Sequence, residues 1–190
     1  QWATKAQLMA AYSAYEQMDY DLAVVKLDRF IDLHPGNDEI SYAYYLRAIC
    51  YYEQISDVRR DQKMTEQSLV YLNDVIKRYP HTEYARDARL KLDLAYDHLA
   101  GKDMSVGRYY QNQGYINAAI QRYNHVLQHY QTTAQTPEAL YRLTESYVTL
   151  GLDQEAQKYA AVLGYNYPDS KWYKSAYKLV KHGETDQDQE

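Results

Sequence analysis

Four segments of this chain end in the same way along the sequence. "LDRFIDLHP", "LNDVIKRYP" and "AAVLGYNYP" end at Pro35, Pro80 and Pro168, and "YNHVLQHYQ" ends in the same register at Gln131. A proline has no N–H to donate inside a helix and it restricts the residue before it, so a helix must end at each of these prolines. The recurring helix end constrains the fold more than any other feature, because it indicates a repeated unit.

The positions before these ends repeat as well. A small residue stands twelve positions before each end, and a bulky apolar residue follows it seven positions later. The small residues are Ala23, Ser68, Ala119 and Ala156, and the bulky ones are Phe30, Val75, Val126 and Leu163. A small side chain allows two helices to cross closely, so each unit is predicted to be a pair of helices. Gly114 and Gly151 stand five positions before two of the small residues and mark the turn within a pair.

We therefore predict an all-α fold, a tetratricopeptide-repeat superhelix of about four helical hairpins followed by a C-terminal helix. Stacked hairpins bury a core that no single hairpin can bury. The predicted array is single and covers residues 4–180. Its repeats span approximately residues 4–35, 41–80, 84–131 and 137–168, with a final helix over 170–181 and a polar tail over 182–190.

Two irregular features are predicted within this array. The charged insertion "SDVRRDQKMTEQ" is expected to form a surface loop that delays the second helix of the second repeat until about Ser68. The third repeat is expected to open with one long helix over residues 84–112, although Gly101 within it costs about 1 kcal/mol relative to alanine. Thr136 is predicted to cap the following helix, with Pro137 in its first turn.

The charge of the chain excludes some classes of partner. The net charge is −5 and the isoelectric point is near 5.7, and no stretch is rich in lysine and arginine. A surface for nucleic acid or for anionic lipid is therefore not expected. No apolar stretch has the length of a membrane span. The first residues, "QWATKAQLMA", do not begin with methionine and contain no apolar core of a signal peptide. We therefore expect the chain to be part of a longer protein.

Few residues suggest catalytic chemistry. His125 and His129 are four residues apart, the spacing at which two imidazoles on a helix can share a metal ion. No glutamate follows the first histidine as in H-E-x-x-H and no third ligand is identifiable, so two histidines on a partly exposed helix are the favoured interpretation. Cys50 has no histidine or asparagine partner motif and is predicted to be a buried structural thiol. With no phosphate-binding glycine loop either, the sequence predicts no enzyme activity, no metal site and no cofactor.

Tyrosine is the unusual feature of the composition, with 24 tyrosines and a single phenylalanine. On the first helices of the first two repeats, one face carries tyrosines opposite the small residues Ala11 and Ala48. These tyrosines are Tyr12, Tyr15, Tyr42, Tyr45 and Tyr52. A groove lined by such rings suits an extended peptide, because the rings give apolar contact and the hydroxyls reach backbone groups. The same rings are equally consistent with packing between repeats, and both interpretations stay open.

Several irregular segments together carry a family resemblance. The insertion "SDVRRDQKMTEQS", the long helix, and the run G-x-x-x-A-x-x-x-R from Gly114 to Arg122 resemble the BamD family over about residues 4–180. This family comprises lipid-anchored tetratricopeptide-repeat components of the machinery that assembles β-barrel proteins into the bacterial outer membrane. Its members carry a further N-terminal repeat and a lipidated cysteine, neither of which is found here. The resemblance thus implies a shortened copy.

The resemblance implies a non-enzymatic scaffold and substrate receptor at the periplasmic face of the outer membrane. The N-terminal repeats of the family are thought to accept the targeting segment of unfolded outer-membrane proteins, which would place substrate on the tyrosine face. The C-terminal repeats dock the periplasmic domains of the barrel subunit BamA, and Arg122 in "AAIQRY" matches an arginine that pairs with an acidic residue of BamA. A guanidinium suits this role because it binds a carboxylate through two parallel hydrogen bonds.

Other interpretations remain. Arg122 taken alone is also consistent with an ordinary ion pair within its helix. Another periplasmic or cytosolic tetratricopeptide-repeat adaptor or co-chaperone that binds extended peptides is the alternative function, although a clamp for a peptide carboxylate would favour lysine and arginine over tyrosine. An enzyme that uses His125 and His129 is a third possibility. Whether Arg47, Arg59 and Arg60 contact accessory lipoproteins of the assembly machinery is left open.

Overall fold

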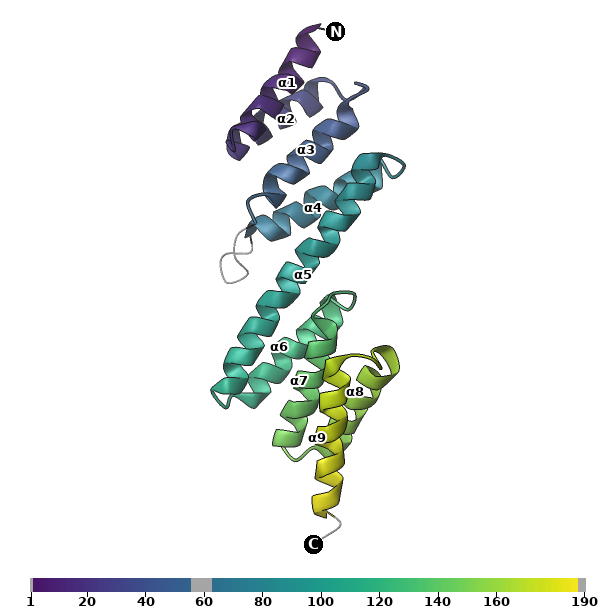
Figure 1. Cartoon of the computed structure of the whole chain (residues 1–190). Helices are drawn as coiled ribbons and strands as arrows, with labels where there is room; N and C mark the ends of the chain where they lie inside the picture. The colour runs from purple at the N-terminus through teal and green to yellow at the C-terminus, as the bar shows by residue number, and fades with distance from the viewer. Residues whose placement is uncertain (1, 56–62, 188–190) are drawn as a thin grey trace. The chain divides into compact units, whose positions relative to one another are not determined.

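The computed structural model describes residues 2–55 and 63–187, and these residues form helices and turns without any strand. The all-α prediction is confirmed. The chain divides into two compact units, residues 1–98 and 99–190, which we call the N-terminal unit and the C-terminal unit. The helices are labelled in Figure 1. They are α1 (Trp2–Glu16), α2 (Tyr20–Leu33), α3 (Ile40–Tyr52), α4 (Lys63–Arg78), α5 (Glu83–Asn112), α6 (Ile116–His129), α7 (Thr136–Thr149), α8 (Asp153–Asn166) and α9 (Lys171–Gln187).

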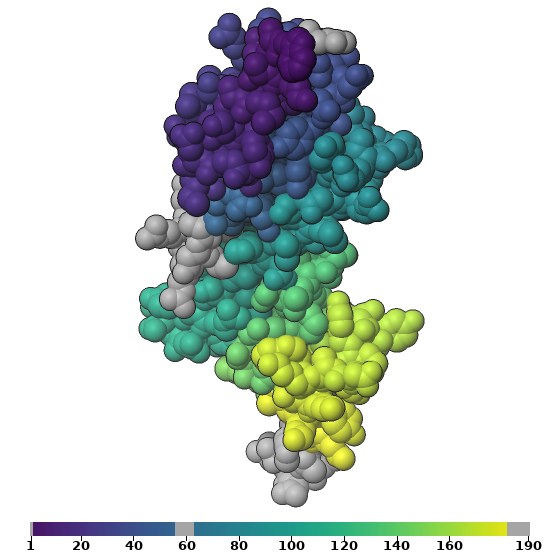
Figure 2. Space-filling view, turned by 45° about the horizontal axis from the view of Figure 1, so that its top comes forward, coloured from purple at the N-terminus to yellow at the C-terminus, as the bar shows by residue number. Residues whose placement is uncertain are grey.

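Consecutive helices pack as hairpins, and the hairpins stack. In the N-terminal unit α1 packs on α2, and α3 packs on α2 and α4. The space-filling view shows α1 and α2, in purple, in continuous contact (Figure 2). In the C-terminal unit α7 packs on α6, α8 and α9. The first helices of neighbouring repeats also touch, α1 with α3 and α7 with α9, so the tetratricopeptide-repeat fold is confirmed. A single array over residues 4–180 stays a prediction.

The repeated small residues lie at the buried centre of each hairpin, as the spacing predicted. Ala23, Ser68, Ala119 and Ala156 are between 0% and 1% exposed. The bulky residues seven positions later are equally buried, and Phe30 is 1% exposed. Ala11 and Ala48, on the partner helices, are 0% exposed. Because the small side chains allow the backbones to approach, the bulky side chains fill the space beside them.

The turn within a hairpin has the same backbone geometry in three repeats. Gly114 and Gly151 have φ values of 80° and 70°, in the left-handed region that favours glycine. Met18 stands five positions before Ala23, the same place in the first repeat, and has a φ of 59°. The backbone N–H after each of these residues donates to the carbonyl five residues before it, for example Asp19 N to Ala14 O at 3.0 Å. This is the hydrogen bond of a Schellman helix end.

The second helix of the second repeat begins earlier than predicted. It starts at Lys63 rather than about Ser68, so the end of the charged insertion forms the first turn of α4. The surface loop predicted for the preceding part of the insertion, residues 56–62, lies outside the described residues. Thr65 is 5% exposed and lies three positions before the buried Ser68. Thr65 therefore belongs to the buried side of α4, although its polar side chain and charged neighbours indicated a loop.

The role predicted for Thr136 is wrong. Thr136 is the first residue of α7 and its hydroxyl donates to the carbonyl oxygens of Tyr130 at 3.1 Å and Gln131 at 3.0 Å. An N-cap side chain would instead accept a hydrogen bond from the helix. Pro137 does lie in the first turn, as expected. The threonine hydroxyl thus stabilises the one repeat end at which Gln131 replaces proline.

The long helix α5 is confirmed as a single helix from Glu83 to Asn112. A second glycine within it, Gly107, was not considered from the sequence and lies against α6. A Cβ atom at Gly107 would be 2.4 Å from Cε1 of Tyr123, which is fully buried. Glycine is therefore required by the close approach of an aromatic ring rather than by the backbone conformation. The final helix, α9, continues to Gln187, beyond the predicted end at about residue 181.

We predict that Met18→Gly stabilises the protein by about 0.5–1 kcal/mol. A left-handed conformation costs an ordinary residue roughly 1–2 kcal/mol, and the greater freedom of glycine in the unfolded chain offsets only about 0.5–1 kcal/mol of that gain. The midpoint of urea unfolding measures the change. Gly151→Ala is the matched control: its Cβ would meet nothing within 4 Å, so a loss of stability there reports conformation alone. An unchanged or lowered midpoint for Met18→Gly would contradict the prediction.

Candidate functional site

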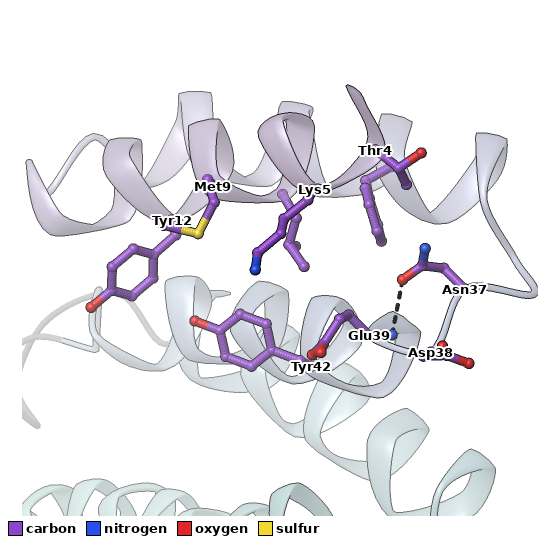
Figure 3. Close-up of a pocket in the computed structure, with 10 residues that line it drawn as sticks. Thr4, Lys5, Met9, Tyr12, Asn37, Asp38, Glu39 and Tyr42 are labelled. Atoms are coloured by element: carbon purple, nitrogen blue, oxygen red, sulfur yellow. Dashed lines mark hydrogen bonds between the residues drawn. The ribbon is translucent and has the colours of Figure 1, made fainter. Parts of the chain in front are cut away.

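The predicted tyrosine face lies on the N-terminal unit, and two of its five tyrosines line a cavity. Tyr12 of α1 and Tyr42 of α3 lie beside a cavity of about 470 Å³ (Figure 3). Its apolar lining includes Leu8 and Phe30, which are nearly buried, and Met9, which is 53% exposed. The cavity therefore offers an apolar surface to a side chain that enters from solvent.

Polar groups surround this apolar surface. Thr4 and Lys5 of α1 stand on one side, and Asn37, Asp38 and Glu39 on the other, at the start of α3 (Figure 3). The side-chain oxygen of Asn37 accepts a hydrogen bond from the backbone N–H of Glu39 at 2.9 Å, which orders this turn. An apolar floor with polar groups at the edge is the usual composition of a site that binds part of a peptide.

Tyr45 lines a second, more open hollow together with Tyr84, Asp87 and Leu90. Its hydroxyl donates to Oδ2 of Asp87 at 2.5 Å. The Tyr84 ring lines this second hollow and also contacts Tyr42 of the first, because its centroid is 5.2 Å from that of Tyr45 and 5.5 Å from that of Tyr42. A run of aromatic rings thus links the hollows within the N-terminal unit. Tyr84 was missed from the sequence, although it is the first tyrosine of the third repeat.

The other two tyrosines of the predicted face serve packing. Tyr15 packs against the core of the first hairpin and lies 5.9 Å from the Tyr20 ring, centroid to centroid. Tyr52 packs beside α4, and Nζ of Lys91 lies 4.7 Å from the centroid of its ring. All five tyrosines are partly buried. Packing between repeats and lining a groove are therefore both functions of this face, and its binding role stays a prediction.

Arg122 lies on the exposed side of α6, in the C-terminal unit. Its Nη1 atom is 3.2 Å from Oδ1 of Asp103 on α5, and Nδ1 of His125 is 2.8 Å from the other oxygen of that carboxylate. The Asp103 side chain is 11% exposed, whereas those of Arg122 and His125 are 47% and 44% exposed. The ion pair between Arg122 and Asp103 joins α6 to α5. It is therefore not a pair within one helix, which was the alternative that the sequence left open for Arg122.

The two histidines of α6 lie close together. The ring centroids of His125 and His129 are 4.3 Å apart, as expected for residues one turn apart on a helix. Among the side chains that the structure describes, those of residues 2–55 and 63–181, no group of three or more histidines, cysteines, aspartates or glutamates is arranged to hold a metal ion. The geometry in this part of the chain places the two imidazoles one turn apart on α6.

Arg47 is used within the fold. Its guanidinium pairs with Asp28 of α2 at 2.7 Å and with Asp74 of α4 at 3.7 Å, and it stacks between the rings of Tyr44 and Tyr71. The Arg47 side chain is 13% exposed, so it joins two repeats and offers little surface to another protein. The corresponding question for Arg59 and Arg60 lies outside the described residues.

Cys50 is buried, as predicted. It is 0% exposed, and burial raises the pKa of its thiol to about 12. A thiol that stays protonated is a poor nucleophile. Cys50 is therefore a packing residue of the first core.

The fold defines a helical-repeat protein of the tetratricopeptide class. A family model described as "Outer membrane lipoprotein" (YfiO) matches residues 1–163. The chain belongs to this family. None of the helices in the described part of the chain combines the length and the apolar character needed to cross a membrane.

Relatives in this family share the name "Outer membrane protein assembly factor BamD". The one from Caulobacter vibrioides is 53% identical over 95% of this chain and 59% of its own length. The one from Rickettsia prowazekii is 54% identical over 94% of this chain and 71% of its own length. One from Neisseria meningitidis serogroup A is 31% identical over 93% of this chain and 70% of its own length. The chain thus spans about three fifths of the Caulobacter relative, and the resemblance found from the sequence is confirmed.

A solved tetratricopeptide-repeat protein from Thermus thermophilus is also similar. It is 18% identical, with a TM-score of 0.32, over 93% of this chain and 98% of its own.

We predict that the free energy of unfolding falls as the pH rises from about 10 to about 12. Burial raises the pKa of Tyr42 and of Tyr123 to about 12, whereas tyrosines of the unfolded chain ionise near pH 10. The stability that these neutral hydroxyls contribute is fully present below pH 10 and is lost as the pH passes through their folded pKa values. Helical circular dichroism and phenolate absorbance, followed together, check this. Complete phenolate formation near pH 10 with the helices intact would contradict it.

Proposed function

We propose that this protein is a non-enzymatic scaffold and substrate receptor in the machinery that assembles β-barrel proteins into the outer membrane. Family membership is the observation that carries the proposal, because relatives more than half identical over nearly the whole chain are named outer membrane protein assembly factors. The fold supports it, since stacked hairpins provide extended binding surfaces without catalytic geometry. In the full-length protein, a lipid anchor would hold the chain at the periplasmic face of the outer membrane, beside accessory lipoproteins.

The C-terminal repeats bind the periplasmic domains of BamA in this proposal, with Arg122 at the contact. Asp103 engages Nη1 of Arg122 and so fixes the guanidinium on the surface of α6. The exposed part of the side chain can then pair with a carboxylate of the partner. Pre-orientation reduces the conformational entropy that a long flexible side chain loses on binding.

The N-terminal repeats bind unfolded substrate segments in this proposal. The cavity beside Tyr12 and Tyr42 and the hollow beside Tyr45 lie on successive first helices of the repeats and are linked by Tyr84. An extended chain places alternate side chains on one face. Two hollows separated by aromatic rings therefore suit a peptide segment with spaced apolar residues, held by stacking and by hydroxyl contacts to its backbone.

We predict that Arg122→Glu weakens binding of the BamA periplasmic domains by about tenfold or more, because it places a negative charge opposite a carboxylate. Binding of the full-length protein is measured in a pull-down and by titration. Arg29→Glu, an exposed arginine of the N-terminal unit, is the matched charge reversal. Because the new glutamate would also lie near Asp103, Arg122→Gln and a thermal unfolding curve separate loss of contact from loss of folding. Unchanged binding of both Arg122→Glu and Arg122→Gln would remove Arg122 from the interface.

We predict that Tyr12→Ser combined with Tyr42→Ser lowers the affinity for a substrate peptide by about tenfold, because aromatic anchors dominate such contacts. The probe is a fluorescent synthetic peptide with the C-terminal segment of an outer-membrane β-barrel protein, followed by anisotropy. Tyr165→Ser is the control, since that ring is 88% exposed in the C-terminal unit. Equal affinities for the double variant, the control and the unaltered protein would exclude the cavity as the peptide site.

A further inference from the structure

The surface around α6 differs in charge from the rest of the protein. The chain has a net charge of −5, yet no aspartate or glutamate lies between Asp103 and Glu138. Helix α6 falls within this stretch. Arg122 and His125, on the exposed face of α6, both contact the carboxylate of Asp103 on α5. In an acidic protein, helix α6 therefore carries no acidic residue of its own.

Three side chains of α6 share one face of this surface. Arg122, His125 and His129 are three and four residues apart, and residues at these spacings lie on the same side of a helix. Arg122 and His129 are exposed and His125 is 44% exposed. One of the three is always positively charged, and imidazole is the side chain that gains a charge between pH 5 and pH 8.

Asp103 determines which atom of His125 faces a partner. An ionised carboxylate can only accept hydrogen bonds, so Nδ1 of His125 must donate to Oδ2 of Asp103 across the 2.8 Å contact. In the neutral ring, Nε2 is then an acceptor and cannot bind a carboxylate. Protonation converts Nε2 into a donor and adds a positive charge. The outward atom of His125 thus changes from one that rejects an acidic partner to one that binds it.

We propose that Arg122, His125 and His129 form one docking surface for an acidic segment of a partner protein, and that protonation of the two histidines strengthens the contact. Charge complementarity favours this partner, because the surface contains no carboxylate that would repel it and one carboxylate that orders its donors. The inference rests on the proposed function, in which Arg122 meets an acidic residue of BamA. It adds the histidines to that contact and makes the contact respond to pH.

The other charged and titratable groups around α6 do not oppose this behaviour. On α5, Lys102 precedes Asp103 and carries a positive charge. On α7, Glu138 pairs with Arg108 at 2.9 Å, and Glu145 pairs with Arg142 at 2.9 Å. These pairs lie around Tyr123, two residues from His125 and therefore on another face of α6. The Tyr130 ring, 5.7 Å from that of His125, follows His129 along the chain.

The test measures the affinity of the full-length protein for the BamA periplasmic domains at about pH 6 and about pH 8, which bracket the titration of imidazole. The unaltered protein is expected to bind about two- to fivefold more tightly at the lower pH, the effect of exposed charge pairs. His125→Gln combined with His129→Gln is expected to lose this ratio. His129→Gln alone, which leaves the His125 bond to Asp103 in place, is expected to lose part of it.

A matched histidine variant separates the titration of the partner from that of this surface. His81→Gln, at an exposed position of the N-terminal unit, is expected to keep the ratio of the unaltered protein. The same ratio in the double histidine variant as in the unaltered protein would overturn the inference and leave the proposed function standing. Full binding by Arg122→Glu at both pH values would overturn the proposed contact and the inference together.

Discussion

The close crossing of two helices within each hairpin is the constraint on which the rest of the structure depends. Ala23, Ser68, Ala119 and Ala156 are completely or almost completely buried at these crossings. A larger side chain there would force the helices apart, which costs about 1–3 kcal/mol in a packed core. The cost would extend beyond one hairpin, because each second helix also carries the bulky residue that fills the space beside its crossing. The surface tyrosines and Arg122 are positioned only as long as these crossings hold.

Local regularity explains how much of the fold could be predicted. Helix ends and small residues repeat at fixed spacings, and these are properties that a single chain displays. Gly107 could have been found in the same way, since it stands twelve positions before Ala119, just as Ala11 stands twelve before Ala23. It was missed because the long helix was treated as one element interrupted only by Gly101. The side chain of Met18 gives no sign of its left-handed backbone, which the helix end around it imposes; only its position, five residues before Ala23 as Gly114 stands before Ala119, points to it.

The candidate sites were harder to predict because their partners are distant in the sequence. The acid that pairs with Arg122 is nineteen positions away on another helix, and α6 itself contains no acid that could have indicated a pair. Tyr45 likewise owes its hydrogen bond to Asp87, forty-two positions away. For the tyrosines, the ring that packs one repeat on the next also forms the wall of a hollow. Composition cannot separate these roles, because one amphipathic side chain performs both.

The two surfaces depend on different forces, and this has a consequence for regulation. Apolar and aromatic contacts in the N-terminal unit change little with salt or with pH below the ionisation of tyrosine. The surface of Arg122 and the histidines depends on charge, so ionic strength screens it and protonation extends it. Each surface belongs to a separate compact unit with its own buried clusters. If both surfaces bind as proposed, conditions that weaken the contact to an acidic partner leave the peptide hollows unchanged, and the chain releases one ligand while it keeps the other.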